Sequence, residues 1–245
     1  MIKEKFYEQI ENLQKKIRET QNDIIHEAAA CMYKSILNDG CIHLFDTGHI
    51  IDSEIINRAG GFELMRHFRY GLNIESVARP RLERTAKEKN TSLEGLAEIA
   101  LRQAQVLPRD VMVIGSVSGR SVNVIDLALA CKKMGVKVIA LTSVEYSSRV
   151  TSKHSSGKRL FEVADIVIDN CAPYGDAMLD IEGLDAPFIP ASGLSAAYIM
   201  WALNADLAEL FVRDGKTPSI LKSVNYDPNI EYNQKLAEIY QKDGY

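Results

Sequence analysis

Residues 111–121, VMVIGSVSGRS, hold the pattern that decides the fold of this chain. Five residues without charge come first, a polar loop follows, and apolar residues then recur at helical spacing at Val122, Ile125 and Leu129. Gly135 comes at the end of that spacing, where a glycine commonly ends a helix. The stretch therefore predicts a buried strand, a loop and a helix, in that order.

The same unit recurs on both sides of this stretch. Further short apolar runs occupy residues 41–45, 136–141 and 166–168. Helical patterns follow or separate them, and two more lie near residues 93–103 and 192–212. Strands that alternate with helices predict βαβ crossovers and a mostly parallel sheet. The fold class is therefore α/β.

The two ends of the chain are expected to be helical. Residues 3–38 carry apolar side chains at three- and four-residue steps and run into Asn38, Asp39 and Gly40, a common helix stop. Residues 228–241 begin with a proline, which suits the first position of a helix. With no repeat and no low-complexity linker, residues 1–245 are expected to form one domain. A long amphipathic helix also favours a homodimer or homotetramer.

Composition limits the class of partner. Of the 245 residues, 46% are hydrophobic and 25% charged, and the formal net charge is −4, so a nucleic-acid partner is not expected. No apolar run reaches the roughly 20 residues that cross a bilayer, and the first residues are too charged for a signal peptide, which predicts a cytoplasmic protein. The four cysteines are scattered and predict reduced thiols, with no metal site: Cys31, Cys41, Cys131 and Cys171.

Three polar loops follow the first three predicted strands, at residues 46–50, 116–121 and 142–148. In an open parallel sheet, ligands bind beyond the carboxyl ends of the strands. The second loop, here called the serine loop, has three hydroxyls and Arg120 at the start of a helix, where an anion is favoured. An alternative is that Ser118 or Ser121 only caps the helix and Gly119 only makes the turn.

The serine loop, VIALTS at 138–143 and ADIVIDN at 164–170 together resemble successive signatures of the sugar isomerase (SIS) domain family. Four more segments are similar to a bacterial group of that family labelled as candidate phosphoheptose isomerases: residues 58–61, 154–158, 175–177 and 223–227. The resemblance implies a three-layer α/β/α sandwich, with a flavodoxin-like five-stranded parallel sheet and a dimer or higher oligomer. It also implies a phosphorylated sugar as ligand, bound by Thr47, Gly48, Ser116, Ser118, Gly119, Arg120, Ser121, Thr142, Ser143 and Ser192.

The chain also departs from the family pattern. The first loop carries Asp46 where a glycine is usual and Ile50 where a serine is usual. Ile50 removes a hydroxyl, and the carboxylate of Asp46 would repel a phosphate unless it is paired or binds sugar hydroxyls. Gly193 also replaces a threonine at the start of the late helix. These changes suggest a different ligand or a weaker dependence on phosphate.

Acid–base catalysis of an aldose–ketose isomerisation needs groups that move protons between carbons and between oxygens. The family glutamate position falls on Gly60, and the late helix contains no histidine, so the usual pair is missing. Four other residues are candidates for this role: His49, Glu54, Glu63 and His154. A solvated or structural role was weighed for each.

The sequence therefore predicts a phosphosugar-binding protein, most simply an aldose–ketose isomerase that needs no cofactor. Two alternatives stay open. One is a sensor that binds a sugar phosphate without turning it over, which the missing glutamate and histidine favour. The other is related chemistry on the same scaffold, such as ether cleavage or amino-sugar processing.

Overall fold

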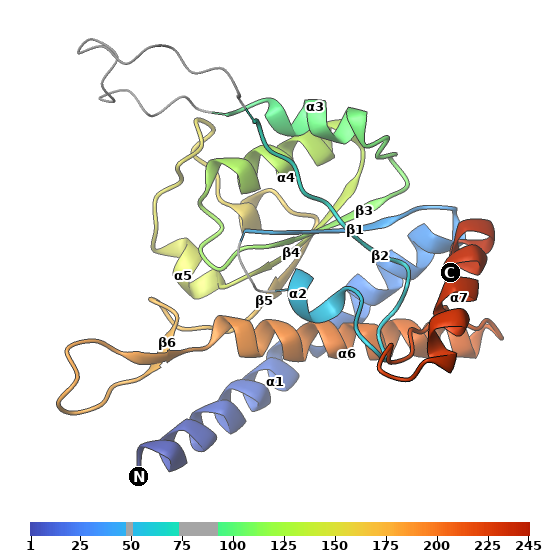
Figure 1. The fold of residues 1–245 in the computed structure, drawn as a ribbon. Helices are drawn as coiled ribbons and strands as arrows, with labels where there is room; N and C mark the ends of the chain where they lie inside the picture. The colour runs from blue at the N-terminus through green and yellow to red at the C-terminus, as the bar shows by residue number, and fades with distance from the viewer. Residues whose placement is uncertain (48–50, 74–92) are drawn as a thin grey trace.

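A five-stranded parallel sheet forms the centre of the protein (Figure 1). The computed structural model describes residues 1–47, 51–73 and 93–245. The strands are β1 (Ile42–Asp46), β2 (Met65–His67), β3 (Val111–Gly115), β4 (Lys137–Thr142) and β5 (Ile166–Asp169), in the order β2-β1-β3-β4-β5. This is the flavodoxin-like order, in which the chain reverses direction across the sheet between β1 and β3. The expected sheet is confirmed.

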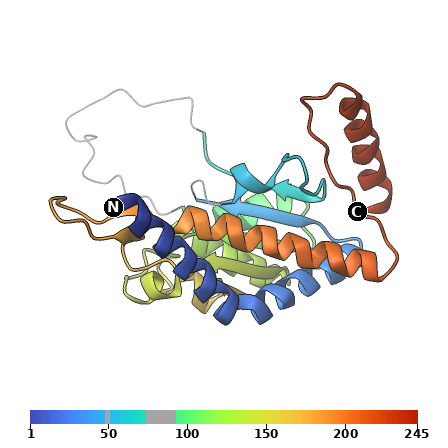
Figure 2. The same cartoon turned by 90° about the horizontal axis from the view of Figure 1, so that it is seen from below.

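Helices cover both faces of the sheet (Figures 1 and 2). One face packs against α1 (Ile2–Leu37) and α6 (Ser192–Arg213), and the other against α3 (Leu96–Gln103) and α4 (Val122–Met134). Strand β3 divides its side chains between the two layers because successive residues point to opposite faces. Val111 and Val113 join the α1/α6 core, whereas Met112 and Ile114 join the α3/α4 core.

The long N-terminal helix was predicted almost to the residue. The buried residues of α1 run from Leu13 to Ile36, and its closest partner is α6. Each buried Leu or Ile contributes about 1.5–3 kcal/mol relative to exposure. Earlier residues of α1, such as Tyr7, are exposed, and Figure 1 shows that part of the helix projecting from the body.

Several short elements were not predicted. Strand β2 has three residues, and α2 (Asp52–Ile55) is a single turn. Strands β6 (Ala177–Leu179) and β7 (Phe188–Pro190) pair antiparallel in a hairpin that projects from the body (Figure 1). The remaining short helices are α5 (Val144–Ser148) and the 3-10 turn η2 (Leu160–Glu162).

The C-terminal region returns to the β2 edge of the sheet. Residues 219–221 pair with residues 60–63 through main-chain bonds, including Leu221 N–H to the carbonyl of Gly61 at 2.9 Å and Glu63 N–H to the carbonyl of Ser219 at 2.9 Å. Helix α7 (Pro228–Asp243) follows and lies at the end of the sheet where the strands begin (Figure 1). The start of β2 is therefore fixed by residues that lie far away in sequence.

A buried carboxylate organises the amino-terminal end of β3. Asp110 accepts the amides of Cys41 and Leu107, each at 3.0 Å, and its Oδ2 lies 3.1 Å from Nε2 of His43. Burial alone would raise the pKa of Asp110, but these hydrogen bonds outweigh it and hold the pKa below its ordinary value. Asp110 thus joins β1, β3 and the turn between α3 and β3.

Two global features complete the description. Among the described residues, no helix combines the length and the apolar composition that crossing a bilayer requires. All four cysteines are free thiols, as expected.

Candidate functional site

The serine loop leaves the buried end of β3 and enters α4. Its first half is fixed against the end of β4, because the amide of Ser116 donates to the carbonyl of Leu141 at 3.1 Å. The carbonyl of Val117 accepts two further bonds at 3.0 Å, from the amide of Ser143 and the hydroxyl of Thr142. The loop is therefore held in one conformation at the carboxyl edge of the sheet.

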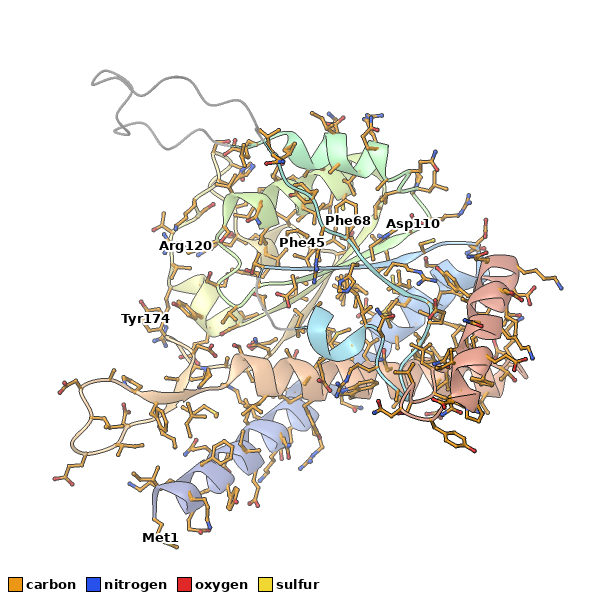
Figure 3. The ribbon with its side chains drawn as sticks, in the orientation of Figure 1. Met1, Phe45, Phe68, Asp110, Arg120 and Tyr174 are labelled. Carbon is orange, nitrogen blue, oxygen red and sulfur yellow. The ribbon has the colours of Figure 1, made fainter. Side chains whose placement is uncertain are left out.

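The side chains of this loop are not used by the fold. In the part of the chain that the structure describes, the hydroxyls of Ser116, Ser118 and Ser121 make no hydrogen bond, although Ser121 is the N-cap residue of α4. The Nε of Arg120 is buried and has no partner within the same described residues. Figure 3 labels Arg120 at the end of the strands opposite Asp110. The loop thus offers hydroxyls, a cation and the positive end of a thirteen-residue helix to an anion.

Gly119 makes the tight turn of the loop possible. Its φ of +55° lies in the left-handed region, where a side chain is disfavoured. A Cβ at this position would lie 3.0 Å from the Cβ of Leu160 and 3.1 Å from Oγ of Ser147. The need for glycine here is therefore steric as well as conformational.

Thr142 and Ser143 have buried hydroxyls that the fold already uses. Both residues are fully buried. Oγ of Ser143 donates to the carbonyl of Ala172 at 2.7 Å and accepts the amide of Tyr146 at 3.0 Å. Ser143 therefore caps α5 and joins β4 to the segment after β5, so its place among the predicted ligand groups needs correction. The hydroxyl of Thr142 shapes the serine loop through Val117.

Ser192 is engaged in the same way at the start of α6. Asp176 accepts the backbone amide of Ser192 at 2.8 Å and its hydroxyl at 2.7 Å. The carboxylate of Asp176 thus occupies the positive end of this helix, the place where an external anion would bind. Ser192 is 2% exposed, and we no longer expect it to contact a ligand.

The first loop contributes Asp46 and Thr47 to the same edge. Oδ2 of Asp46 accepts the amide of Ile51 at 2.6 Å, which closes the loop between β1 and α2. The amide of Thr47 lies 3.4 Å from the carbonyl of Gly115, beside the start of the serine loop, and Thr47 is exposed. Gly48, His49 and Ile50, on which two predictions depend, lie outside the described residues.

The structure separates two of the acid–base candidates. Glu54 belongs to α2 and pairs with Arg58 at 3.5 Å. Glu63 precedes β2, at the edge where the strands begin, and pairs with Arg66 at 3.0 Å. It lines a groove of about 750 Å³ between residues 57–59 and α7. Glu63 therefore lies at the opposite end of the sheet from the serine loop, and its assignment to that site is wrong.

His154 is close to the serine loop in the chain order of contacts but is not exposed. Its side chain is 7% exposed, and Nε2 lies 3.9 Å from carboxylate oxygens of both Glu94 and Asp126. Nδ1 accepts the amide of Ser156 at 3.0 Å. Both ring nitrogens therefore face protein groups, an arrangement that suits a structural part better than proton exchange with a ligand.

Some residues near the site were missed by sequence reasoning. The hydroxyl of Ser147 is fully buried, lacks a hydrogen bond in the described structure, and lies beside Gly119. Asn170 has a buried Nδ2 in the same condition at the end of β5. Both follow predicted strands, which was the available signal, but many polar residues follow strands. Among the described residues, no group of three or more potential metal ligands comes together.

A family model described as the SIS domain matches residues 5–143, more than half of the chain. The chain belongs to the SIS-domain family. Within it, the UPF0309 protein of Oceanobacillus iheyensis is 37% identical over 241 residues, covering 96% of this chain and 95% of that protein. The UPF0309 protein of Halalkalibacterium halodurans is 35% identical over 232 residues, with 92% of each chain covered. This SIS protein is thus also a member of the UPF0309 group.

Solved structures support the same fold at lower identity. Phosphoheptose isomerase GmhA from Neisseria gonorrhoeae has a TM-score of 0.55 and 16% identity, covering 85% of this chain and 97% of that one. An Escherichia coli CFT073 protein, solved in complex with a phosphosugar, has a TM-score of 0.50 and 17% identity, covering 85% and 89%. At these identities the likeness of the SIS protein to both structures concerns the fold.

Proposed function

We propose that this protein binds a phosphorylated sugar, with the phosphate on the serine loop and the first turn of α4. The observation that carries the proposal is that Ser116, Ser118 and Ser121 keep their hydroxyls unbonded among the described residues, beside the buried and unpaired Nε of Arg120. Polar groups that cluster without partners at a strand-to-helix turn are expected to have an external one.

The position of the loop supports the same ligand. It lies between β1 and β4 at the carboxyl edge, next to the point where the strand order reverses. A helix end and a guanidinium favour an anion, whereas Thr47 on the neighbouring loop offers a hydroxyl to the sugar part. The family and the fold are those of proteins named as isomerases of such compounds.

We further propose aldose–ketose isomerisation as the reaction, with His49 and Glu54 as the proton-transfer groups. Glu54 lies in the helical turn that follows the first loop, and His49 belongs to that loop. Isomerisation of this kind needs one group that moves a proton between neighbouring carbons and another that serves the oxygens. A general base in this role contributes typically 10²–10⁴-fold to rate.

A second candidate is a sensor that binds the phosphosugar without turnover. The placement of two predicted acid–base residues favours it: Glu63 lies at the other end of the sheet, and His154 is buried among carboxylates. The remaining acid–base inventory near the serine loop is therefore small.

A panel of pentose, hexose and heptose phosphates, followed by NMR detection of ketose–aldose exchange, tests these proposals. We expect at least one phosphosugar to bind, and Ser118→Ala to weaken its binding about 5–10-fold at unchanged thermal stability, since a hydroxyl bonded to a charged acceptor is worth about 1.5 kcal/mol. Lack of binding by every sugar phosphate would remove the proposal. Turnover that is lost in His49→Ala supports the isomerase, and binding without turnover supports the sensor.

A further inference from the structure

The serine loop is supported from behind by the segment that joins α5 to η2. The amide of Lys153 donates to the carbonyl of Arg120 at 2.9 Å, and the amide of Leu160 donates to the carbonyl of Gly119 at 2.8 Å. These two bonds fix the half of the loop that β4 does not hold. The conformation of the loop therefore depends on what holds residues 152–160.

Glu94, which precedes α3, holds that segment. Its carboxylate accepts the amide of Ser155 at 2.9 Å through Oε1 and the hydroxyl of the same serine at 2.5 Å through Oε2. A carboxylate that receives two hydrogen bonds from one residue constrains both its main chain and its side chain. Residue 155 is exposed, so this bracket is its main tie to the body of the protein.

His154 adds a second connection next to the bracket. Because Nδ1 accepts the amide of Ser156, the proton of the neutral ring lies on Nε2, which faces Glu94 and Asp126 at 3.9 Å. Asp126, on α4, in turn accepts the amides of Gly95 and Ala97 at 2.9 and 3.0 Å. The start of α3, the body of α4 and the supporting segment thus meet at one histidine.

We propose that Glu94, His154 and Ser155 form a latch that positions the serine loop for its ligand. The inference rests on the proposed function, because it assigns these residues to the affinity of that same site. None of them contacts the ligand, so they are positioning residues. His154, considered above as a catalytic candidate, acts through the carbonyl of Arg120 and the turn at Gly119.

The latch acts by preparing the loop before binding. A loop that is already ordered loses less conformational freedom when its ligand binds, and the affinity is higher by that difference. When the latch is broken, residues 152–160 keep only their connections to neighbouring elements, and the carbonyls of Gly119 and Arg120 lose fixed partners. We expect affinity to fall because the free loop samples other conformations.

The experiment measures amide hydrogen exchange and binding in Glu94→Ala, Glu94→Gln and His154→Ala. Glu98→Ala is the matched control, since Glu98 lies on α3 and also has a multiply bonded carboxylate, with Arg102 and Lys133, away from the loop. The latch predicts faster exchange at the amides of Lys153 and Leu160 and across residues 116–121 in Glu94→Ala. It also predicts about 10-fold weaker binding of the phosphosugar identified in the panel and of inorganic phosphate.

The Gln variant keeps an acceptor for Ser155 and should recover part of the affinity, whereas a merely structural loss would follow thermal stability instead. Unchanged exchange in residues 116–121 of Glu94→Ala, at unchanged stability, overturns the latch. If Glu94→Ala does not fold, Ser155→Ala, in the exposed segment, removes one of the two bracket bonds and is judged on the same exchange. If the wild-type protein binds no phosphosugar, the proposed function fails, and the exchange data alone decide whether the latch orders the loop.

Discussion

The hydroxyl of Ser143 donates to the carbonyl of Ala172 at 2.7 Å and thereby joins the end of β4 to the segment that follows β5. The same oxygen accepts the amide of Tyr146 and caps α5. A serine expected to bind a ligand thus serves the protein itself. This distinction between structural and available hydroxyls can be measured.

Ser143→Ala should destabilise the protein by about 1–3 kcal/mol, because it removes a helix cap and leaves a carbonyl without its donor. Urea unfolding checks this value. Two serines of α5 provide controls. Ser148→Ala removes an exposed bond to Glu145 and should change the free energy of unfolding by less than about 0.5 kcal/mol. Ser147→Ala removes a hydroxyl that has no described partner and should cost little; a loss equal to that of Ser143→Ala would contradict this account.

Gly119→Ala should destabilise the protein by about 2 kcal/mol or more and abolish phosphosugar binding. The substitution combines an unfavourable positive φ with contacts near 3 Å to Leu160 and Ser147. Gly157→Ala is the control, since Gly157 has a φ of +70° but nothing within 4 Å of its Cβ. Thermal unfolding of both variants separates backbone strain from collision. Equal losses would show that the contacts at Gly119 are unimportant.

Asp110 should make stability depend on acid. Its pKa in the folded protein is lower than in the unfolded chain, where Asp titrates near about 4, so its contribution is present above that pH and is lost as the pH falls through the lower folded value. Asp110→Asn should cost about 2–4 kcal/mol at neutral pH, because an amide cannot accept from all three donors. The variant should also lose less stability than wild type between pH 5 and pH 3.

The control for this measurement is Glu231→Gln in α7, where an exposed carboxylate pairs with Lys235. It should leave the free energy of unfolding nearly unchanged at neutral pH. Parallel acid profiles of Asp110→Asn and wild type would show that other carboxylates dominate acid unfolding.

Asp176 should stabilise α6 as a cap supplied from outside the helix. Asp176→Ala should cost about 1–2 kcal/mol, since both bonds to Ser192 are lost. Asp176→Asn should lie between wild type and Ala, because asparagine tolerates the φ of +69° and keeps one acceptor. Chemical denaturation gives the order of the three proteins, and an Asn variant no better than Ala would rule out the capping role.

Local pattern was enough to predict most of the fold. The long apolar runs became β1, β3, β4 and β5, and long periodic segments became α1, α4, α6 and α7. Strand β2 was missed because three residues, Met65 to His67, carry no period, and its pairing depends on β1. The hairpin was missed for a similar reason, since Pro190 lies within a strand of three residues at its edge.

The site was harder to predict because it depends on contacts between distant segments. The serine loop follows directly from the strand–loop–helix pattern. That Ser143 and Ser192 are already bonded depends on Ala172 and Asp176, whose approach no local spacing reveals. Glu63 seemed near the site because it follows the first loop in sequence, yet the chain crosses the whole length of the sheet before reaching it.

The pairing of residues 219–221 with residues 60–63 has a consequence for biosynthesis. During translation, the start of β2 emerges early, but the main-chain groups that complete it are made only after β3, β4, β5 and α6. Until then, this rim of the nascent sheet presents unsatisfied amides and carbonyls to other polypeptides. The ribosome-bound chain is therefore most vulnerable to misassociation at this rim, and closure by the late segment ends that exposure.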